Sequence, residues 1–174
     1  NNAGSGYVTY RRTGSTGAYT TNSLTSFNGV IYVAGGAHIR PPASRPASVV
    51  NGEVTVASPN AIYLDGSVTY ASAVGQNVFA TNFNPIGILD DSLGIVSSQG
   101  VWVTPQSATT IHAAILVTDG NTGFSATYAS SSFGTPNLSV YGSISQWRRG
   151  IVGYTSGAGF RKRYSYDHRF RTRP

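Results

Sequence analysis

The sequence is dominated by short runs of alternating apolar residues, each broken after a few positions by glycine or a small polar residue. The stretch NAIYLDGSVTYA at residues 60–71 is typical, with apolar-x-apolar on both sides of an Asp-Gly pair. Alternation with a period of two predicts β-strands, because successive side chains of a strand point to opposite faces. No ten-residue stretch has a helical period, so we expect little helix, with one turn allowed within residues 105–116.

The runs resemble one another in their order of residue types as well as in their period. IYVAGGAHI, IYLDGSVTY and GIVSSQGVWV begin near residues 30, 62 and 94, a spacing of about 32, and YGSISQWRRGIVGY repeats the phrase later. A repeat of this length is typical of solenoids, in which each coil adds short strands to parallel sheets. The sequence therefore predicts an all-β chain with a parallel β-solenoid (β-helix) of short Val/Ile/Tyr-rich coils. We expect the solenoid at 29–154, an irregular lead-in with short strands at 1–28, and a basic aromatic segment at 155–174. The expected strands cover 29–35, 48–58, 61–71, 93–104, 110–120, 138–147 and 150–154.

An antiparallel β-sandwich is the alternative fold, because it also has many short strands with frequent turn residues. Asp-Gly pairs are common at the tips of hairpins as well. The two folds differ at Asp65-Gly66, which is a bend between two faces in a solenoid and a hairpin tip in a sandwich. In the solenoid four flanking residues face the core, namely Ile62, Leu64, Val68 and Tyr70.

Three segments interrupt the runs. Residues 39–48 are rich in proline, residues 72–85 form a long connection, and residues 124–137 combine aromatic and turn-forming residues. We expect all three to be surface insertions, which are common places for binding in repeat proteins.

The composition favours a role without catalysis. The chain has no Cys, only 6 acidic residues and 3 His. Asp90 and Asp91 are adjacent and fit a turn, and His112 fits a packed strand position. No paired carboxylates, metal-ligand spacing, nucleophile elbow or phosphate-binding loop is evident. We therefore predict no enzyme, no small-molecule substrate, no cofactor and no metal site.

The abundance of Ser, Thr, Gly and Asn, with no Cys, favours a bacterial extracellular or cell-surface location. The chain begins with Asn and contains no Met, which is expected of a fragment or a processed protein. No apolar stretch is long enough to span a bilayer, so we expect any membrane attachment only through an N-terminal anchor missing from this sequence.

Positive charge is concentrated at the C-terminal end. Residues 148–174 contain eight basic residues and one acidic residue, Asp167, interleaved with aromatic residues. Arginine binds phosphate, and aromatic rings offer stacking platforms for unpaired bases, so this end is a candidate site for DNA or another polyanion. For Trp147, Phe160 and Tyr164 we favour packing at the end of the solenoid over ligand contact. The candidate binding residues are Arg148, Arg149, Arg161, Lys162, Arg163, Arg169, Arg171, Tyr164 and Tyr166.

The order of several short segments along the chain resembles that in a known protein family. GVIYVAGGAHI, IHAAIL, VYGSISQWRRG and the YSYD tail, together covering roughly residues 28–170, are similar to the C-terminal portion of large type IV pilin-like proteins. These are proteins of the PilX class and the related ComZ-type competence minor pilins. The resemblance implies a β-solenoid that is carried as the exposed domain and follows an N-terminal membrane helix. This sequence lacks that helix. It also implies other pilin or filament subunits as partners, and a role in DNA uptake, adhesion or filament assembly.

Three functions follow as expectations. The first is a non-enzymatic pilin-like domain that binds DNA or another polyanion through its basic end. The second is a structural spacer whose basic end docks on a partner subunit. The third is a carbohydrate-binding β-helix that uses the tyrosine-rich segments at 63–70 and 124–141.

Overall fold

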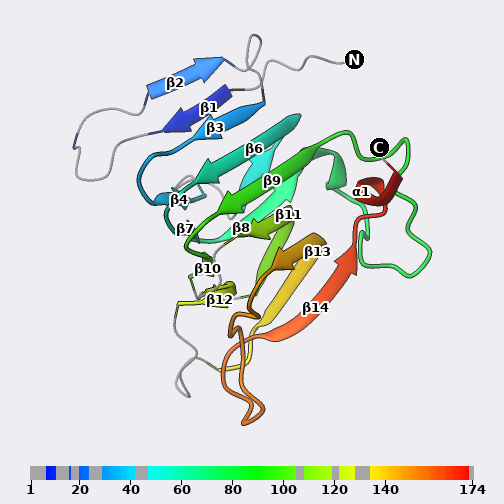
Figure 1. The fold of residues 1–174 in the computed structure, drawn as a ribbon. Helices are drawn as coiled ribbons and strands as arrows, with labels where there is room; N and C mark the ends of the chain where they lie inside the picture. The colour runs from blue at the N-terminus through cyan, green and yellow to red at the C-terminus, as the bar shows by residue number, and fades with distance from the viewer. Residues whose placement is uncertain are drawn as a thin grey trace.

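The computed structural model describes residues 7–10, 16, 20–23, 29–41, 47–104, 108–118, 122–127 and 134–172 (Figure 1). Fourteen strands account for most of the regular structure in these ranges. Two short helices complete it, η1 (Ala71–Ala73) and α1 (Arg169–Thr172). The strands are β1 (Tyr7–Tyr10), β2 (Thr20–Ser23), β3 (Val30–Tyr32), β4 (Ala37–Ile39), β5 (Ala47–Val50), β6 (Glu53–Ser58), β7 (Ile62–Leu64), β8 (Ser67–Tyr70), β9 (Ser92–Ser97), β10 (Val101–Val103), β11 (Thr109–Val117), β12 (Phe124–Ala126), β13 (Asn137–Gln146) and β14 (Arg161–Tyr166).

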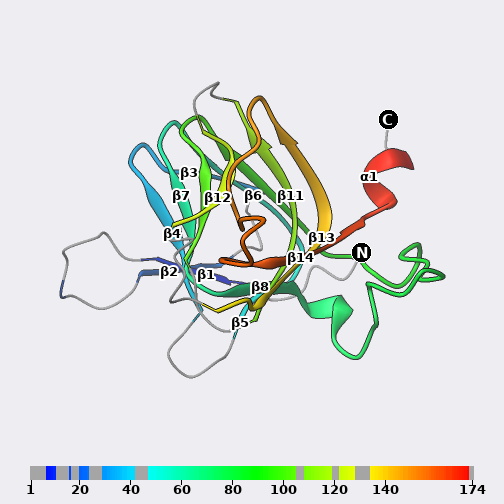
Figure 2. The same cartoon turned by 90° about the horizontal axis from the view of Figure 1, so that it is seen from below.

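Strands β3 to β14 form two parallel sheets. The larger runs in the order β14-β13-β11-β9-β6-β3, with β8 also on β11 and β5 on β8, and the smaller runs β12-β10-β7-β4. Every pairing within these two sheets is parallel, and the β1–β2 pair is antiparallel. The predicted all-β class is therefore confirmed, and the alternative of an antiparallel sandwich is wrong. Figure 2 views the strands along their stacking direction, with β4, β7 and β12 on one side and β11 and β13 on another.

The Asp65-Gly66 pair is a bend between two sheets. Strand β7 before it pairs with β4 and β10 in the smaller sheet, whereas β8 after it pairs with β5 and β11 in the larger one. All four flanking apolar residues are at most 1% exposed, which confirms the predicted core positions: Ile62, Leu64, Val68 and Tyr70. The hairpin reading of this pair is excluded, because its two halves do not pair with each other.

The predicted period of about 32 residues is wrong. Ile62 lies beside Ala37 on one side and Val101 on the other, so one step spans 25 residues and the next 39. The similar phrases near residues 30, 62 and 94 fall on β3, β7 and β9, of which β7 belongs to the smaller sheet. The long step contains the segment 71–91 between β8 and β9, an insertion that breaks any fixed spacing.

Three other local predictions, for residues 105–116, 124–137 and 150–154, are wrong in whole or in part. Residues 109–117 are strand β11, so the helical turn allowed at 105–116 is wrong for its described part, and residues 105–107 lie outside the described residues. Residues 124–126 form the buried strand β12 instead of a surface insertion. Residues 150–154 carry no named strand. Half of the proline-rich segment 39–48, at 42–46, lies outside the described residues.

Two aspartates with little exposure, Asp65 and Asp91, hold the bends and the 71–91 insertion in place. Asp65 accepts hydrogen bonds from Thr104 Oγ1 (2.7 Å), His38 Nδ1 (2.8 Å) and Arg40 Nη2 (2.9 Å). Burial raises the pKa of Asp65, but these donors outweigh it and the pKa is lowered overall. Asp91, 2% exposed, accepts from Gly52 N and from both the amide and the hydroxyl of Ser72. The Asp91 carboxylate therefore joins the two ends of the 71–91 insertion to Gly52, in the bend between β5 and β6. Asp90 and Asp91 lie after the turn at 86–88 and not in it, so the predicted turn at these two residues is wrong.

The 71–91 insertion packs aromatic side chains against the larger sheet. Phe79 and Phe83 contact the ring of Tyr141 edge-on, with centroids 6.3 and 6.0 Å apart. His112 lies in the same cluster, 5.1 Å from the ring of Tyr70, and accepts a hydrogen bond from the Tyr70 amide at 3.2 Å. His112 is 5% exposed, so the predicted packed position is confirmed.

His112 makes stability depend on pH. Burial lowers its pKa from 6.5 to about 4, against the opposing charge of Asp167. The unfolded chain therefore takes up a proton in a range where the folded chain does not, and stability is lost as pH falls from about 6.5 towards 4. We expect a loss of about 3 kcal/mol in the free energy of unfolding across this range. Urea denaturation at a series of pH values measures it.

The matched variant is His112→Gln, which has no charge at any of these pH values. It should be less stable than the native chain at pH 7.5 and show a flatter profile between pH 6.5 and 4. An unchanged slope in the variant would show that other groups cause the effect.

Candidate binding groove at the end of the sheets

Strand β14 is the last strand of the larger sheet, and its register places three side chains over the core. Lys162 lies beside Leu138, Tyr164 beside Val140, and Tyr166 beside Gly142. Leu138 and Val140 are 0% and 2% exposed, whereas Tyr164 and Tyr166 are 49% and 43% exposed. Interior-facing positions thus become exposed at β14, because no further strand among the described residues covers them.

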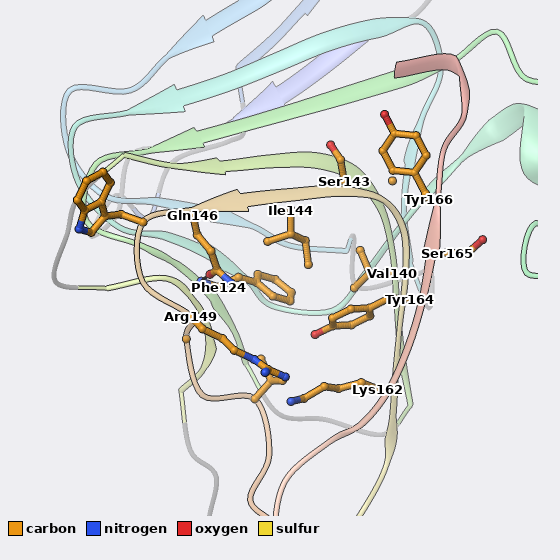
Figure 3. A pocket seen from close by; sticks show the side chains of 14 residues that line it. Phe124, Val140, Ser143, Ile144, Gln146, Arg149, Lys162, Tyr164, Ser165 and Tyr166 are labelled. Carbon is orange, nitrogen blue, oxygen red and sulfur yellow. Dashed lines mark hydrogen bonds between the residues drawn. The ribbon is translucent and has the colours of Figure 1, made fainter. Parts of the chain in front are cut away.

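The exposed end of the core is hollowed into a groove of about 810 Å³, which we call the end groove (Figure 3). Its walls come from β12, β13, β14 and the connection after β13. None of the described residues that line it is Asp or Glu. One part of the lining is apolar and consists of Phe124, Val140, Ile144 and Val152. The other part is polar and basic and consists of Arg149, Lys162, Tyr164 and Tyr166.

Two cations meet in the end groove. Arg149 and Lys162 reach into it from opposite sides, and the ring of Tyr164 lies beside Lys162 (Figure 3). In the part of the chain that the structure describes, neither has an ion-pair partner. Burial raises the pKa of Tyr164, and the positive charge of Arg149 opposes that rise. Two uncompensated cations in one concave site favour an anionic ligand.

The other face of β14 is chemically different. Arg161 and Arg163 alternate with the groove-facing residues and so lie on the outer face. The guanidinium of Arg163 stacks over the ring of Phe79 at 4.8 Å, in the insertion that covers this face. Arg163 also lines a second, smaller pocket of about 230 Å³ together with Tyr141 and His168. The part of the predicted basic cluster at 161–166 is therefore divided between two faces of one strand.

Arg169 has a structural position. Its side chain is 11% exposed and forms a two-pronged ion pair with Asp167, with Nη2 to Oδ2 at 2.7 Å and Nε to Oδ1 at 3.0 Å. Arg169 Nη1 also donates to the carbonyl of Leu89 at 2.9 Å, and its guanidinium lies over the ring of Tyr70. These contacts join helix α1 to the 71–91 insertion, so the guanidinium of Arg169 is occupied within the protein.

The remaining candidates separate by exposure. Arg148 and Arg171 are exposed. Phe160 is 5% exposed, which confirms its predicted packing. Trp147 was also predicted to pack, but it is 82% exposed and lines the end groove. Sequence reasoning missed the apolar lining from β12 and β13, because nothing in those residues distinguishes them from other core positions.

Within the described residues, no group of three or more His, Asp or Glu side chains is placed to hold a metal ion. No helix of the described chain is long and apolar enough to cross a membrane. Comparison with protein-family models, with curated proteins and with solved structures found no match.

Proposed function

We propose that this chain is a non-enzymatic binding domain that holds a linear polyanion, such as DNA, in the end groove. The observation that carries the proposal is the convergence of Arg149 and Lys162 in a groove of about 810 Å³ whose lining contains no carboxylate. An anionic polymer would neutralise both cations and release its own counterions, which favours binding at low salt.

The fold suits this role. We propose that the two parallel sheets are faces of a β-solenoid whose C-terminal end is left open as the binding surface. Support comes from the register, in which β7 to β8 and β10 to β11 pass from the smaller to the larger sheet in successive turns of the chain. An exposed end on a rigid stack fits the cell-surface, pilin-like domain that the sequence resembles, acting in DNA uptake or adhesion.

The experiment measures binding of a fluorescein-labelled oligonucleotide by anisotropy between 20 and 200 mM NaCl. We expect affinity to fall steeply with salt, with a log–log slope of about −1.5 to −2 for two phosphate contacts. The variant Arg149→Ala/Lys162→Ala should weaken binding at least tenfold for any sequence and flatten the salt dependence.

The matched control is Arg171→Ala, which removes an exposed arginine that does not line the end groove. It should lose much less affinity than the double variant. Equal losses in both variants would mean that net charge alone drives binding. No binding of DNA, polyphosphate or heparin at 20 mM salt would overturn the proposal.

A second candidate function is docking on a partner subunit. The observation that favours it is the outer edge of β14, where no described strand pairs, since an open edge can accept a strand from another chain. If this is the function, the double variant leaves assembly with the partner unchanged, because strand addition uses the main chain of β14, as size-exclusion chromatography of the complex would show.

A further inference from the structure

We infer that the end groove recognises unpaired nucleobases, so that its polyanion is single-stranded nucleic acid. This inference rests on the proposed function and specifies its ligand. The cations alone would accept any polyanion, and the selectivity comes from the aromatic and apolar surface around them.

The two tyrosines of β14 supply stacking surfaces on the groove side. Tyr164 and Tyr166 are two residues apart in one strand, so their side chains project from the same face and their Cα atoms lie about 6.6 Å apart along it. Stacked bases repeat at about 3.4 Å, which is half of this distance. A nucleotide chain along β14 therefore matches both rings only when its bases are separated from one another, as a flexible single strand permits.

The lining beside the tyrosines is apolar. Val140, Ile144 and Phe124 line the end groove, and Val140 continues a buried column through Ile111 to Val68. A phosphate chain has no apolar face for this lining. A nucleobase presents a flat ring face that can stack on a tyrosine or cover the apolar side chains.

The cations lie beside the aromatic surface. Lys162 precedes Tyr164 by two residues on the same face, and Arg149 enters from the other side (Figure 3). Phosphates can thus contact the cations while the attached bases contact the rings. In a duplex both faces of each internal base are already stacked, so only the phosphate contacts remain.

Trp147 extends the aromatic surface at the groove. Its side chain is 82% exposed and lines the same cavity as the two tyrosines. An indole this exposed gains little from packing within the chain, and it offers a third stacking surface to a strand that leaves the groove.

The test compares three ligands of equal length: a twelve-residue oligothymidine, the same oligomer built from abasic sites, and a blunt duplex. The abasic oligomer keeps the phosphates and lacks the bases. We expect oligothymidine to bind at least tenfold more tightly than either of the others at 100 mM salt, because each stacked base is worth about fivefold or more.

The variants Tyr164→Leu and Tyr166→Leu keep every charge and an apolar side chain. Each should weaken oligothymidine binding about fivefold or more and leave abasic binding unchanged. Trp147→Ala, whose side chain is too exposed to threaten folding, provides the same readout if a tyrosine variant does not fold. Far-ultraviolet circular dichroism checks the fold of each variant.

The outcomes separate the two proposals. If the abasic oligomer, polyphosphate or heparin binds as tightly as oligothymidine, and the aromatic variants weaken all ligands equally, base recognition is wrong while polyanion binding stands. If no ligand binds, both proposals are wrong. If duplex binds more tightly than oligothymidine, the single-strand inference is overturned.

Discussion

Replacing Asp167 with Asn is expected to lower the free energy of unfolding by about 3–5 kcal/mol, because it leaves a buried guanidinium without its counterion. Asp167 is 0% exposed and meets Arg169 through two hydrogen-bonded oxygen atoms. Both groups are removed from water, so the loss of one partner is far more costly than at a surface ion pair. Urea denaturation followed by circular dichroism measures the effect.

Two further variants show whether the pair is the cause. Arg171→Ala changes an exposed arginine in the same helix and should shift stability by about 0.5 kcal/mol or less. Asp167→Asn combined with Arg169→Met removes both charges, and it should be no less stable than Asp167→Asn alone. A double variant that loses the sum of the effects of Asp167→Asn and Arg169→Met, each measured alone, would show that the residues act independently.

The second large effect is expected at Gly142, where β13 lies between β11 and β14. Its φ is +150°, and a Cβ atom at this position would collide with the backbone carbonyl of Ala113. The obstacle is backbone of the paired strand, so it cannot turn aside as a side chain can. Gly142→Ala should therefore cost about 3 kcal/mol or more, through strain and overpacking together, and thermal and urea unfolding both report it.

Two glycines serve as matched controls. Gly75 has a positive φ of +80° and no atom within 4 Å of the added Cβ, so Gly75→Ala isolates the conformational cost at about 1–2 kcal/mol. Gly35 has neither constraint, and Gly35→Ala should change stability by about 0.5 kcal/mol or less. Equal losses at Gly142 and Gly75 would show that the contact with Ala113 adds nothing.

Both sites support the end groove. The amide of Asp167 donates to the carbonyl of Gly142 at 3.1 Å, where β14 ends. Arg169 then joins this point to Leu89 in the 71–91 insertion. We expect the destabilised Asp167→Asn variant to retain groove binding at low temperature while folded, because Asp167 does not line the groove, whereas Gly142 does.

Much of the strand content could be predicted because alternation is a local property. The bend at Asp65-Gly66 and the buried positions of Ile62 and Tyr70 follow from short-range spacing and are confirmed. The repeat length was wrong, because similar phrases occur on strands of different sheets. A similar order of residue types identifies the residues that form strands. The register in which those strands pair depends instead on the length of every connection between them.

At the basic C-terminal end, too, local properties were predictable and the pairing of strands was not. Its charge and aromatic content were evident from the sequence, but residues 161–166 were assigned to a segment beyond the sheets, and they form strand β14. The strand decided which residues share a face. Lys162, Tyr164 and Tyr166 line the end groove, and Arg163 stacks on Phe79 from a distant insertion.

The sequence by itself determined that this chain forms short strands with small-residue bends, that its acids are few, and that its cations gather at one end. These are properties of composition and of neighbours a few residues apart, and local sterics and side-chain alternation fix them. Only the tertiary structure decided which cations are free to meet a ligand. Arg169 and Lys162 are equivalent in the sequence, but one is neutralised by buried Asp167 and the other faces the open end of the core. The position of Lys162 arises from parallel pairing between strands more than twenty residues apart, and that of Arg169 from its contact with the distant Leu89, neither of which a local pattern encodes.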